Sequence, residues 1–353
     1  MEQKEKPLES GFRNIMKEKN ILVIRLSAMG DVAMTVPTIA SVVEKYPNTH
    51  ITMLTNERFA PLFATLPRVE VFGINPKNYD GLWGLFRLFG ELKKLKKWYA
   101  VVDLHNVIRS KVLRMLFSLS GIKCIAVEKD RAGRRELTAR RHKHLKPLRT
   151  VQRQYMRTFS AAGFHLHEQA FSLFPSENKA PANVKKGKWL GIAPFASYEG
   201  KIYPENQMET VIKKLSEKEN LSIFLFGNGE KETAVLKRWE ETYPNVKSVA
   251  GKMSLGEELQ FMSWLDAMLT MDSANMHLAS LVNIPVISIW GQTHPYAGFF
   301  GNGQAENHPV QVGLPCRPCS VYGNKKCYLG TLDCMKKITP EMVIEKIESV
   351  ITI

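Results

Sequence analysis

The stretch MDSANMHLASLVNIPVISIWGQTHP, residues 271–295, decides the fold of this 353-residue chain. A short apolar run at 267–271 ends in Asp-Ser-Ala-Asn, a helical pattern follows, and a second apolar run closes with Gly-Gln-Thr. Strand, turn, helix and strand in this order predict one βαβ unit. Its turn places small residues and a polar cap at a helix N-terminus, where free backbone N–H groups and the helix dipole favour an anion. The sequence therefore predicts a site for a phosphate-bearing ligand.

Strand and helix patterns alternate along the rest of the chain. Continuous apolar runs at 21–26, 99–105 and 189–195 are typical of buried parallel strands. Pro37 cannot lie deep in a regular helix, so the helix after the first strand is expected to begin near Thr35 or to kink there. Further strands are expected at 50–54, 124–127, 221–228 and 246–249, and helices at 106–120, 204–219, 230–243, 255–265 and 340–352. This alternation predicts an α/β fold with parallel sheets and helices on both faces.

The length of the chain suits two domains rather than one core. The strand and helix pattern restarts after PSENKAPANVKKG, residues 175–187, which has the composition of a linker. We expect two doubly wound, Rossmann-like domains that face each other across a cleft. The expected divisions are a flexible N-terminal segment 1–20, a first domain 21–174, the linker 175–187, a second domain 188–336 and a C-terminal helix 337–353.

Composition and charge narrow the class of protein. A hydrophobic content of 44% and a charged content of 24% are those of a soluble globular protein. No apolar run approaches the ~20 residues that span a bilayer, and the first twelve residues lack the apolar core of a secretory signal. The sequence therefore predicts a cytoplasmic location.

The net charge of +15 indicates an acidic partner, such as nucleic acid, an anionic membrane or a phosphorylated substrate. Positive charge concentrates at residues 129–157, which form either a solvated basic surface or a groove for an anionic acceptor. No nucleic-acid-binding motif accompanies it, so nucleic acid is not expected as a partner. The segment 82–98 has the pattern of a helix that lies on a membrane. Packing of its apolar face on the sheet, with its lysines solvated, is favoured, and both hold if only the end of the helix touches lipid.

Four of the five cysteines cluster near the C-terminal end of the chain, at Cys316, Cys319, Cys327 and Cys334. Disulfides are not expected in a cytosolic chain, so clustered thiols raise structural zinc as an alternative. The second pair lacks the CxxC spacing of a zinc site, and thiols without a metal are favoured. No cofactor is expected to be required.

Ligands of doubly wound folds bind beyond the carboxyl ends of the strands. That rule selects the loops 27–31, 104–106, 194–201, 226–230, 271–277 and 290–295. In the first of them Asp31 follows Gly30, and it is either a helix cap or a general base. Lys201 is a point charge suited to a phosphate or an ordinary surface lysine, and Ser197 is small enough to let backbone amides reach the same group.

Two more polar residues have both a functional and a structural interpretation. Glu230 follows FGNG at a strand end, where a carboxylate binds ribose hydroxyls or caps the next helix. His277 lies in the first turn of the helix after Asp272, and it points either into the ligand crevice or into the core.

Taken together, these turns resemble glycosyltransferase family 9, the heptosyltransferases of lipopolysaccharide core assembly. Residues 21–47, ILVIRLSAMGDVAMTVPTIASVVEKYP, resemble the family's opening strand, S-x-x-GD turn and helix with an internal proline. Residues 271–295 resemble its D-[ST]-G-x-x-H block, which ends in G-x-T. The resemblance covers nearly the whole chain.

The resemblance implies a GT-B architecture, with the acceptor held by the N-terminal domain and the nucleotide sugar by the C-terminal one. It implies inverting transfer of a heptose, or a related sugar, from an ADP-sugar to the anionic inner core of lipopolysaccharide or lipid A, without a catalytic metal. A monomer is expected, at the cytoplasmic face of the inner membrane as a peripheral protein.

The resemblance also assigns roles to individual residues. Asp31 matches the general base and Lys201 the lysine that neutralises the donor diphosphate, so these two are the expected catalytic residues. The expected donor-binding residues are Ser197, Glu230, Asp272, Ser273, Ala274, Asn275, Met276, His277 and Thr293. The expected acceptor-binding residues are Ser27, Met29, Gly30, His105, Arg109, Arg134, Arg135 and Arg140.

Four positions depart from the family pattern. Ala274 stands where the family usually has glycine, Asn275 and Gln292 vary near the same pocket, and Tyr203 replaces a tryptophan-like position. These departures leave the exact donor sugar open. Two other functions remain as alternatives: a sugar-nucleotide epimerase of the GT-B fold, and a non-catalytic binder of anionic lipid or nucleic acid.

Overall fold

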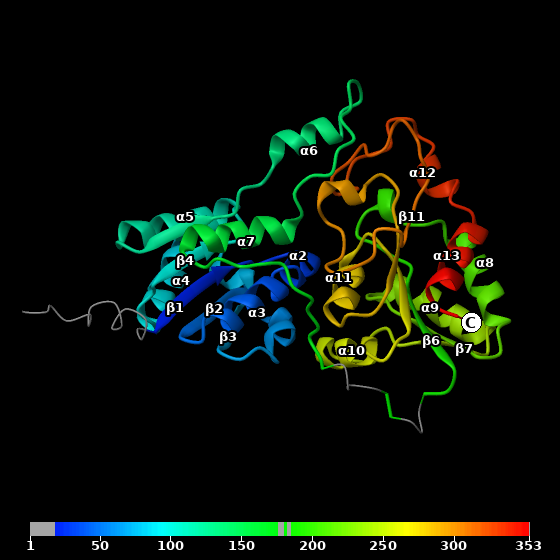
Figure 1. Cartoon of the computed structure of the whole chain (residues 1–353), viewed down its shortest axis with the longest axis horizontal. Coiled ribbons are helices and arrows are strands. Elements are labelled where there is room, and N and C mark those ends of the chain that lie inside the picture. Colours follow the sequence, from blue (N-terminus) through cyan, green and yellow to red (C-terminus); the bar gives the residue numbers. More distant parts are fainter. Residues whose placement is uncertain (1–17, 176–179, 182–184, 353) are drawn as a thin grey trace, which may run out of the picture. The chain divides into compact units, whose positions relative to one another are not determined.

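The computed structural model describes residues 18–175, 180–181 and 185–352, which divide into two compact units (Figure 1). The first unit comprises 18–27, Thr38–Glu128 and Tyr155–His167. The second comprises Ala28–Pro37, Lys129–Gln154 and the described residues from Glu168 onward. Each unit is built around its own parallel sheet, so the α/β class predicted from the alternating pattern is confirmed.

The sheet of the first unit has five parallel strands in the order β3-β2-β1-β4-β5. The strands are β1 (Lys19–Ile24), β2 (Thr49–Asn56), β3 (Val69–Ile74), β4 (Ala100–Asp103) and β5 (Lys123–Ala126). Ile21 of the central strand β1 pairs with Ile51 on one side and with Ala100 on the other. The chain order reverses between β1 and β4, which is where doubly wound sheets bind ligands.

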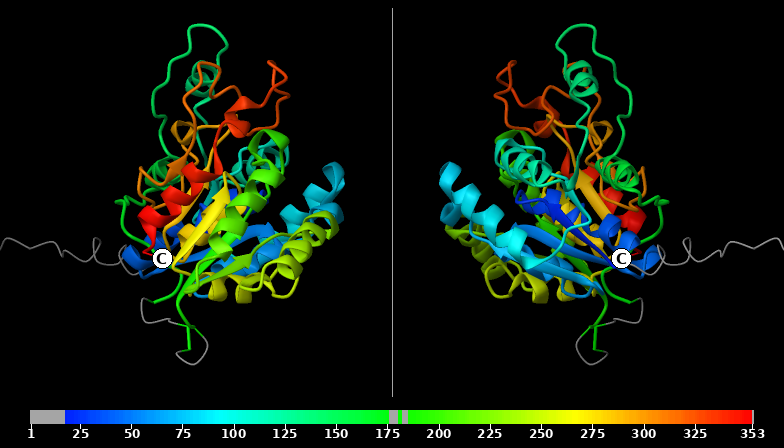
Figure 2. Two further views of the ribbon diagram at one scale, coloured as in Figure 1. Left: turned by 90° about the vertical axis from the view of Figure 1, so that its right-hand side faces the viewer. Right: turned by 90° about the vertical axis from the view of Figure 1, so that its left-hand side faces the viewer.

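Helices cover both faces of this sheet, namely α3 (Val36–Lys45), α4 (Gly81–Leu95), α5 (Ile108–Leu119) and α7 (Val151–Ala162). Pro37 lies in the first turn of α3, as expected, where its missing N–H costs no helical hydrogen bond. The helix α4 buries Leu85, Leu88 and Leu92, so the predicted packing of its apolar face is confirmed. It lies beside α5 (Figure 2), with the rings of Phe89 and Phe117 4.9 Å apart.

The sheet of the second unit has six parallel strands in the order β11-β10-β9-β6-β7-β8. The strands are β6 (Lys188–Ala193), β7 (Leu221–Leu225), β8 (Val246–Ser248), β9 (Ala267–Met271), β10 (Val286–Ile289) and β11 (Pro309–Val310). Met268 of β9 pairs with Val286 of β10, so the βαβ unit predicted from residues 271–295 is confirmed. The order reverses between β6 and β9.

The helices of the second unit are α2 (Met29–Ala33), α6 (Arg131–Leu137), α8 (Glu205–Ser216), α9 (Glu230–Thr242), α10 (Leu255–Met262), α11 (Ala274–Leu281), α12 (Asp333–Lys336) and α13 (Pro340–Val350). Local sequence explains several of their ends. Ser254 caps α10 in a capping box with Glu257, and Thr339 caps α13 ahead of Pro340. Pro204 stands at the cap of α8 and not in its first turn. Among the described helices, none combines the length and the apolar character needed to cross a bilayer.

The units differ from the domain boundaries expected from sequence. Residues 28–37 and 129–154 fall inside the expected first domain 21–174, yet they pack with the second sheet. The reason is that these segments contact residues that are distant in sequence. The helix α2 packs on α11, and the segment 129–154 contacts residues 296–328. Residues 1–17 of the expected N-terminal segment lie outside the described residues. The same holds for 176–179 and 182–184 of the expected linker.

Candidate functional site

A close approach of two helices forms the centre of the site in the second unit. The short helix α2 carries Gly30 and Asp31, and it packs against α11, which carries His277. A Cβ atom on Gly30 would lie only 2.8 Å from Cδ2 of His277 and 3.4 Å from the Cα of Ala274. Only glycine fits this approach without displacing the imidazole ring. The S-x-x-GD turn and the first turn of α11, about 240 residues apart in sequence, are therefore adjacent in space.

A buried ion pair joins the two central strands of the second sheet. Lys201 lies in the loop after β6 and Asp272 directly after β9. Their Nζ and Oδ2 atoms are 3.1 Å apart, and the side chains are 16% and 7% exposed. Gly323 supports the lysine, because a Cβ there would lie 2.4 Å from Cγ of Lys201. The ammonium group is thus held at the point where the strand order reverses.

His277 completes this cluster as a neutral imidazole. It is 7% exposed, and burial lowers its pKa to about 4, although the charges of Asp272 and Asp31 favour protonation and that of Lys201 opposes it. Within the described part of the chain, Nδ1 of His277 has no hydrogen-bond partner. The site therefore combines two carboxylates, one ammonium and one neutral imidazole with an unused nitrogen.

The lowered pKa of His277 makes stability depend on pH. An unfolded histidine takes up its proton near pH 6.5, whereas the folded one does so at about 4. This contribution to the free energy of unfolding is therefore complete above pH 6.5, and it is lost as the pH falls toward 4, by roughly 3 kcal/mol. Urea unfolding between pH 7 and pH 4 is expected to show this component in the natural protein and to lack it in His277→Gln. The exposed His144→Gln is the matched control, and equal pH slopes for the natural protein and His277→Gln would contradict the assignment.

The N-terminus of α11 remains available to an anion. Ser273 occupies the cap position, but its hydroxyl lies 3.2 Å from the hydroxyl of Thr270 and makes no capping bond. The first backbone N–H groups of α11, which begin at Ala274 and continue through Asn275 and Met276, thus lack a side-chain cap. Together with Lys201 they offer positive charge on one side of the cluster.

A second loop, Gly291 to Thr293, is fixed by buried polar contacts. The backbone of Gln292 donates to the carbonyl of Gly200 at 3.0 Å, and its side chain lies against that glycine. Arg317, which is 5% exposed, donates to the carbonyls of Trp290 and Thr293 at 3.0 Å each. Sequence reasoning missed Arg317, because its position between two cysteines carries no signal that the charge is buried. Tyr203 is a core residue whose hydroxyl donates to the carbonyl of Ile338.

Asp31 and Glu230 make different contacts at the starts of their helices. The carboxylate of Asp31, in the first turn of α2, accepts weakly from the backbone N–H of the N-cap residue Ala28 at 3.4 Å, which is the return bond of a capping box. Glu230 is exposed in the first turn of α9. The backbone N–H of Asn228, just before this helix, donates to the carboxylate of Glu232 at 2.9 Å. The ribose-binding role of Glu230 stays a prediction, and so does the donor-binding role of Ser197, which is exposed after β6.

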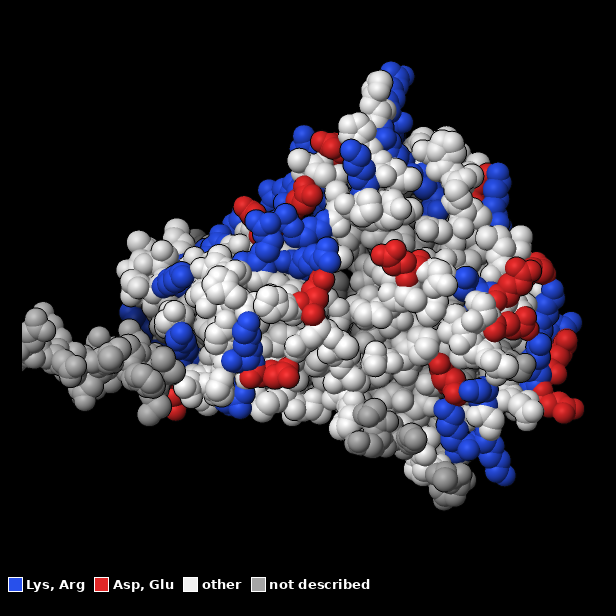
Figure 3. All heavy atoms as spheres, in the orientation of Figure 1, with Lys and Arg blue, Asp and Glu red and all other residues white. Residues whose placement is uncertain are grey.

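The basic segment 129–154 is partly solvated and partly anchored to the second unit. Figure 3 shows Lys and Arg side chains gathered around α6 and the loop beyond it. Arg134 donates to the hydroxyl of Tyr322 at 2.9 Å and lies over the ring of Phe299. Arg140 lies over the ring of Tyr328, whereas Arg135 is exposed. Two of the three predicted acceptor arginines here thus stack on aromatic rings.

The clustered cysteines beside this segment are free thiols. Burial raises the pKa of Cys334 to about 11, which keeps it protonated. Across the described ranges, no three residues of His, Cys, Asp or Glu are arranged to hold a metal ion. The expectation of metal-free thiols at Cys316, Cys319, Cys327 and Cys334 stays a prediction.

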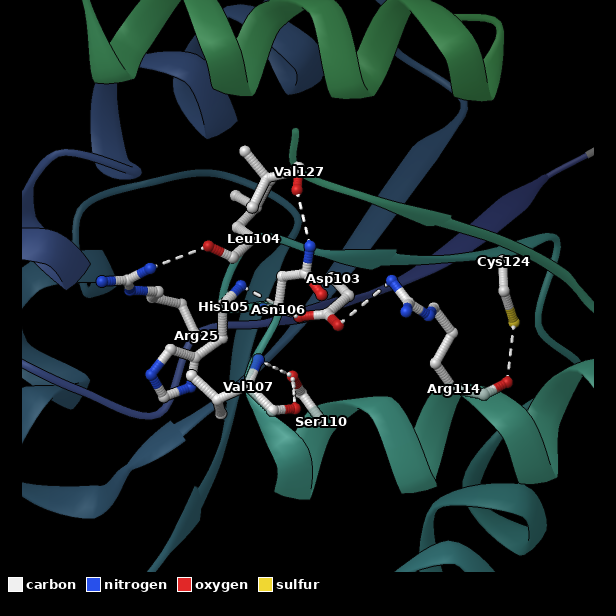
Figure 4. Close-up of polar contacts among 10 residues, drawn as sticks. All are labelled: Arg25, Asp103, Leu104, His105, Asn106, Val107, Ser110, Arg114, Cys124 and Val127. Carbon is white, nitrogen blue, oxygen red and sulfur yellow. Dashed lines mark hydrogen bonds and ion pairs between the residues drawn. The ribbon is translucent and has the colours of Figure 1, made fainter. Parts of the chain in front are cut away.

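In the first unit, the turn after β4 is held by one buried carboxylate (Figure 4). Oδ1 of Asp103 accepts from the backbone N–H groups of His105 at 2.9 Å and Asn106 at 2.8 Å. Its other oxygen lies 3.5 Å from Arg114, and Asp103 is fully buried. Asn106 adopts a left-handed backbone with φ of 48°, which asparagine tolerates better than most residues. This turn presents the predicted acceptor residue His105 at the carboxyl end of the sheet.

Two other predicted acceptor residues lie near the same edge of the first unit. Ser27 is exposed shortly after β1. Arg109 is engaged within the protein, because it donates to the carbonyl of Pro76 at 3.0 Å and to Asp80 at 3.1 Å. Arg25, which follows β1, is buried and donates to the carbonyl of Leu104 at 2.8 Å (Figure 4).

Comparison with known proteins identifies the family. A model described as glycosyltransferase family 9 (heptosyltransferase) matches residues 86–328, more than half of the chain. The chain belongs to glycosyltransferase family 9. This confirms the predicted family, and it makes the protein a glycosyltransferase as expected.

Family 9 relatives align over most of their own length. "Lipooligosaccharide heptosyltransferase 2" of Campylobacter jejuni serotype O:6 is 25% identical over 92% of this chain and 96% of the relative. "Lipopolysaccharide core heptosyltransferase OpsX" of Haemophilus influenzae is 22% identical over 78% of this chain and 80% of the relative.

Solved structures show the fold of this family 9 member. Escherichia coli heptosyltransferase WaaC with ADP has a TM-score of 0.67 at 19% identity and covers 94% of this chain and 100% of its own. A family 9 glycosyltransferase from Veillonella parvula has a TM-score of 0.70 at 18% identity, over 95% and 97% of the two chains. The predicted GT-B fold, with two parallel-sheet α/β domains, is confirmed.

Proposed function

We propose that this family 9 glycosyltransferase transfers a heptose from an ADP-activated donor to the inner core of lipopolysaccharide, with inversion at the anomeric carbon. The observation that carries the proposal is the cluster of Asp31, Lys201, Asp272 and His277 at the reversal point of the second sheet. The relatives named above as heptosyltransferases of lipooligosaccharide and lipopolysaccharide core support this choice of sugar and acceptor.

On the donor side, the positive groups of the second unit match a diphosphate. Lys201 exchanges its contact with Asp272 for a phosphate oxygen, and the uncapped N–H groups of α11 bind the same anion. Negative charge grows on the departing ADP as the glycosidic bond breaks. Fixed cations and amides are most effective where such charge develops, because they need no reorganisation. Thr293, Ser197 and Glu230 are assigned to the rest of the nucleotide sugar.

On the acceptor side, Asp31 acts as the general base. It takes the proton of an acceptor hydroxyl while that oxygen attacks the anomeric carbon and ADP leaves from the opposite face. A single displacement of this kind inverts the configuration. His277 is neutral at the working pH, so it adds no positive charge beside the carboxylate of Asp31. The exposed Arg135, with His105 and the other acceptor residues predicted above, is assigned to the phosphates of the acceptor.

The deciding experiment incubates the purified protein with ADP-heptose, with and without a deep-rough lipopolysaccharide acceptor, and follows both by mass spectrometry. Heptose on the acceptor and release of ADP are the expected products. A donor that is isomerised without any acceptor would instead indicate an epimerase. An unchanged donor and acceptor would indicate a binding protein, and either result would overturn the proposal.

The proposal also covers the cellular location and the oligomeric state of the enzyme. The enzyme is expected to act as a monomer at the cytoplasmic face of the inner membrane, where its lipid-anchored acceptor is made. The basic side chains around α6 support an anionic partner. Multi-angle light scattering of the purified chain tests the monomer, and a stable dimer would contradict that part.

A further inference from the structure

Two neighbouring helices of the first unit expose large apolar side chains. Trp83 on α4 is 87% exposed, and Ile108 and Leu119 on α5 are 83% and 79% exposed. Leu82, Phe86 and Met115 on the same two helices are also exposed. Single exposed apolar residues are ordinary, but a contiguous group of them on a soluble protein marks a surface that contacts something else.

These side chains form an outer stripe that is separate from the core-facing one. In α5 the buried residues are Ser110, Leu113 and Phe117, whereas Ile108, Met115 and Leu119 follow at steps of seven and four and share the opposite face. In α4 the three leucines that pack on the sheet leave Trp83 and Phe86 outside, with their rings 6.2 Å apart. Core packing therefore does not explain the outer stripe.

Polar contacts hold the two stripes next to each other. The ion pair of 3.1 Å between Arg109, near the start of α5, and Asp80, just before α4, joins the N-terminal ends of the helices. Lys93 near the end of α4 contacts the hydroxyl of Ser120, which follows α5. Trp83 and Ile108 thus belong to one surface, which we call the α4–α5 face.

The charge around the α4–α5 face is predominantly positive. Residues 81–123 contain nine Lys and Arg but only two acidic residues, and one of these, Asp103, is fully buried. Lys93, Lys94 and Lys97 are exposed at the end of α4, and Lys111 is exposed on α5. Lysine is depleted in protein–protein interfaces, whereas basic residues beside exposed Trp, Phe and Leu are typical of surfaces that bind anionic lipid.

We propose that the α4–α5 face docks onto an anionic phospholipid bilayer. Trp83, Phe86 and Ile108 enter the interface between headgroups and acyl chains, and the lysines contact the lipid phosphates. The exposed apolar and basic side chains of the face are the basis of this proposal. It rests on the proposed function only for the biological reason to dock, which is a lipid-anchored acceptor. The N-terminal ends of both helices lie at the carboxyl edge of the first sheet, as does the turn that carries His105, so docking would bring this edge to the membrane.

Vesicle co-sedimentation of the full-length chain tests the proposal. The natural protein is expected to bind vesicles of phosphatidylethanolamine and phosphatidylglycerol, and to bind phosphatidylcholine vesicles much less. The double variant W83S/I108S is expected to bind anionic vesicles roughly tenfold or more weakly, because it removes two of the three inserted side chains. The variant K93Q/K94Q/K97Q is expected to bind less tightly and with a weaker dependence on salt. The control L145S/L329S alters exposed leucines of the second unit and is expected to bind like the natural protein.

Two results would overturn the proposal. One is binding of W83S/I108S to anionic vesicles that equals binding of the natural protein. The other is a concentration-dependent dimer, seen by light scattering, that W83S/I108S dissolves, because the face would then bind a second copy. Transfer to a detergent-dispersed acceptor separates this test from the proposed function. The variant is expected to keep that activity, and a protein that binds vesicles but transfers no sugar would refute the function alone.

Discussion

Replacing Asp31 with asparagine is expected to abolish sugar transfer while donor binding survives. Asparagine has nearly the same size, and its amide oxygen can still accept the weak bond from the backbone of Ala28. It cannot take a proton from the acceptor hydroxyl, so kcat is expected to fall by roughly 100- to 10,000-fold. Initial rates of ADP release measure the loss, and calorimetric titration with an ADP-heptose analogue measures the binding.

A matched control separates the chemistry from general effects. Asp333→Asn changes a carboxylate of the same unit that is paired with Lys337 on the surface of α12, and it is expected to leave both rate and affinity unchanged. If Asp31→Asn keeps its activity, the base lies elsewhere. If it loses donor affinity in proportion to its rate, Asp31 is a binding residue and the assignment of the base is wrong.

Replacing Lys201 with methionine is expected to harm both stability and catalysis. The variant leaves the carboxylate of Asp272 buried without its cation, and breaking a buried pair in this way costs about 3–5 kcal/mol of unfolding free energy. The leaving diphosphate also loses the ammonium group, so kcat and donor affinity both fall. Urea unfolding and steady-state kinetics measure the two effects.

The double variant Lys201→Met/Asp272→Asn separates the effect on stability from the effect on catalysis. It removes the unpaired buried charge of Asp272 but does not restore the ammonium group of Lys201. It is expected to recover most of the stability and none of the activity. The control Lys214→Met breaks a half-exposed ion pair with Glu341 and is expected to change stability by less than about 1 kcal/mol. Recovery of activity in the double variant would show that Lys201 serves only to neutralise Asp272.

Much of the fold follows from local patterns in the sequence. The apolar runs at 21–26, 99–105 and 189–195 became β1, β4 and β6, each central or next to the centre of a parallel sheet, where both faces are buried. The start of α3 followed from Pro37, since proline is tolerated only in a first turn. Patterns of this kind act over a few residues and therefore survive in a single sequence.

The domain membership of 28–37 and 129–154 did not follow, because it depends on contacts between distant segments. Nothing in SAMGD indicates that α2 leaves the first sheet to pack on α11. Likewise, the stacking of Arg140 on Tyr328 joins residues that are far apart in sequence and individually ordinary. Tertiary contacts of this kind have no local signature.

The site was predictable where a turn follows a strand and less so elsewhere. Asp31, Lys201 and His277 were selected because the carboxyl ends of parallel strands meet at one edge, and the structure brings them together. Arg317 and Gly323 were missed, although one holds the loop at Thr293 and the other supports Lys201. Both act through backbone approach and burial, which one sequence does not reveal.

The place of α2 has a consequence for anyone who recombines members of this family. Because residues 28–37 are structurally part of the second unit, a chimera cut at the linker would import a foreign α2 and seat it on the resident α11. The foreign helix would have to supply glycine opposite His277 and, next to that glycine, the proposed proton acceptor. A hybrid that retains the native 28–37 and 129–154 with the rest of the second unit would instead keep α2, with the proposed base, and α11 as one inherited piece.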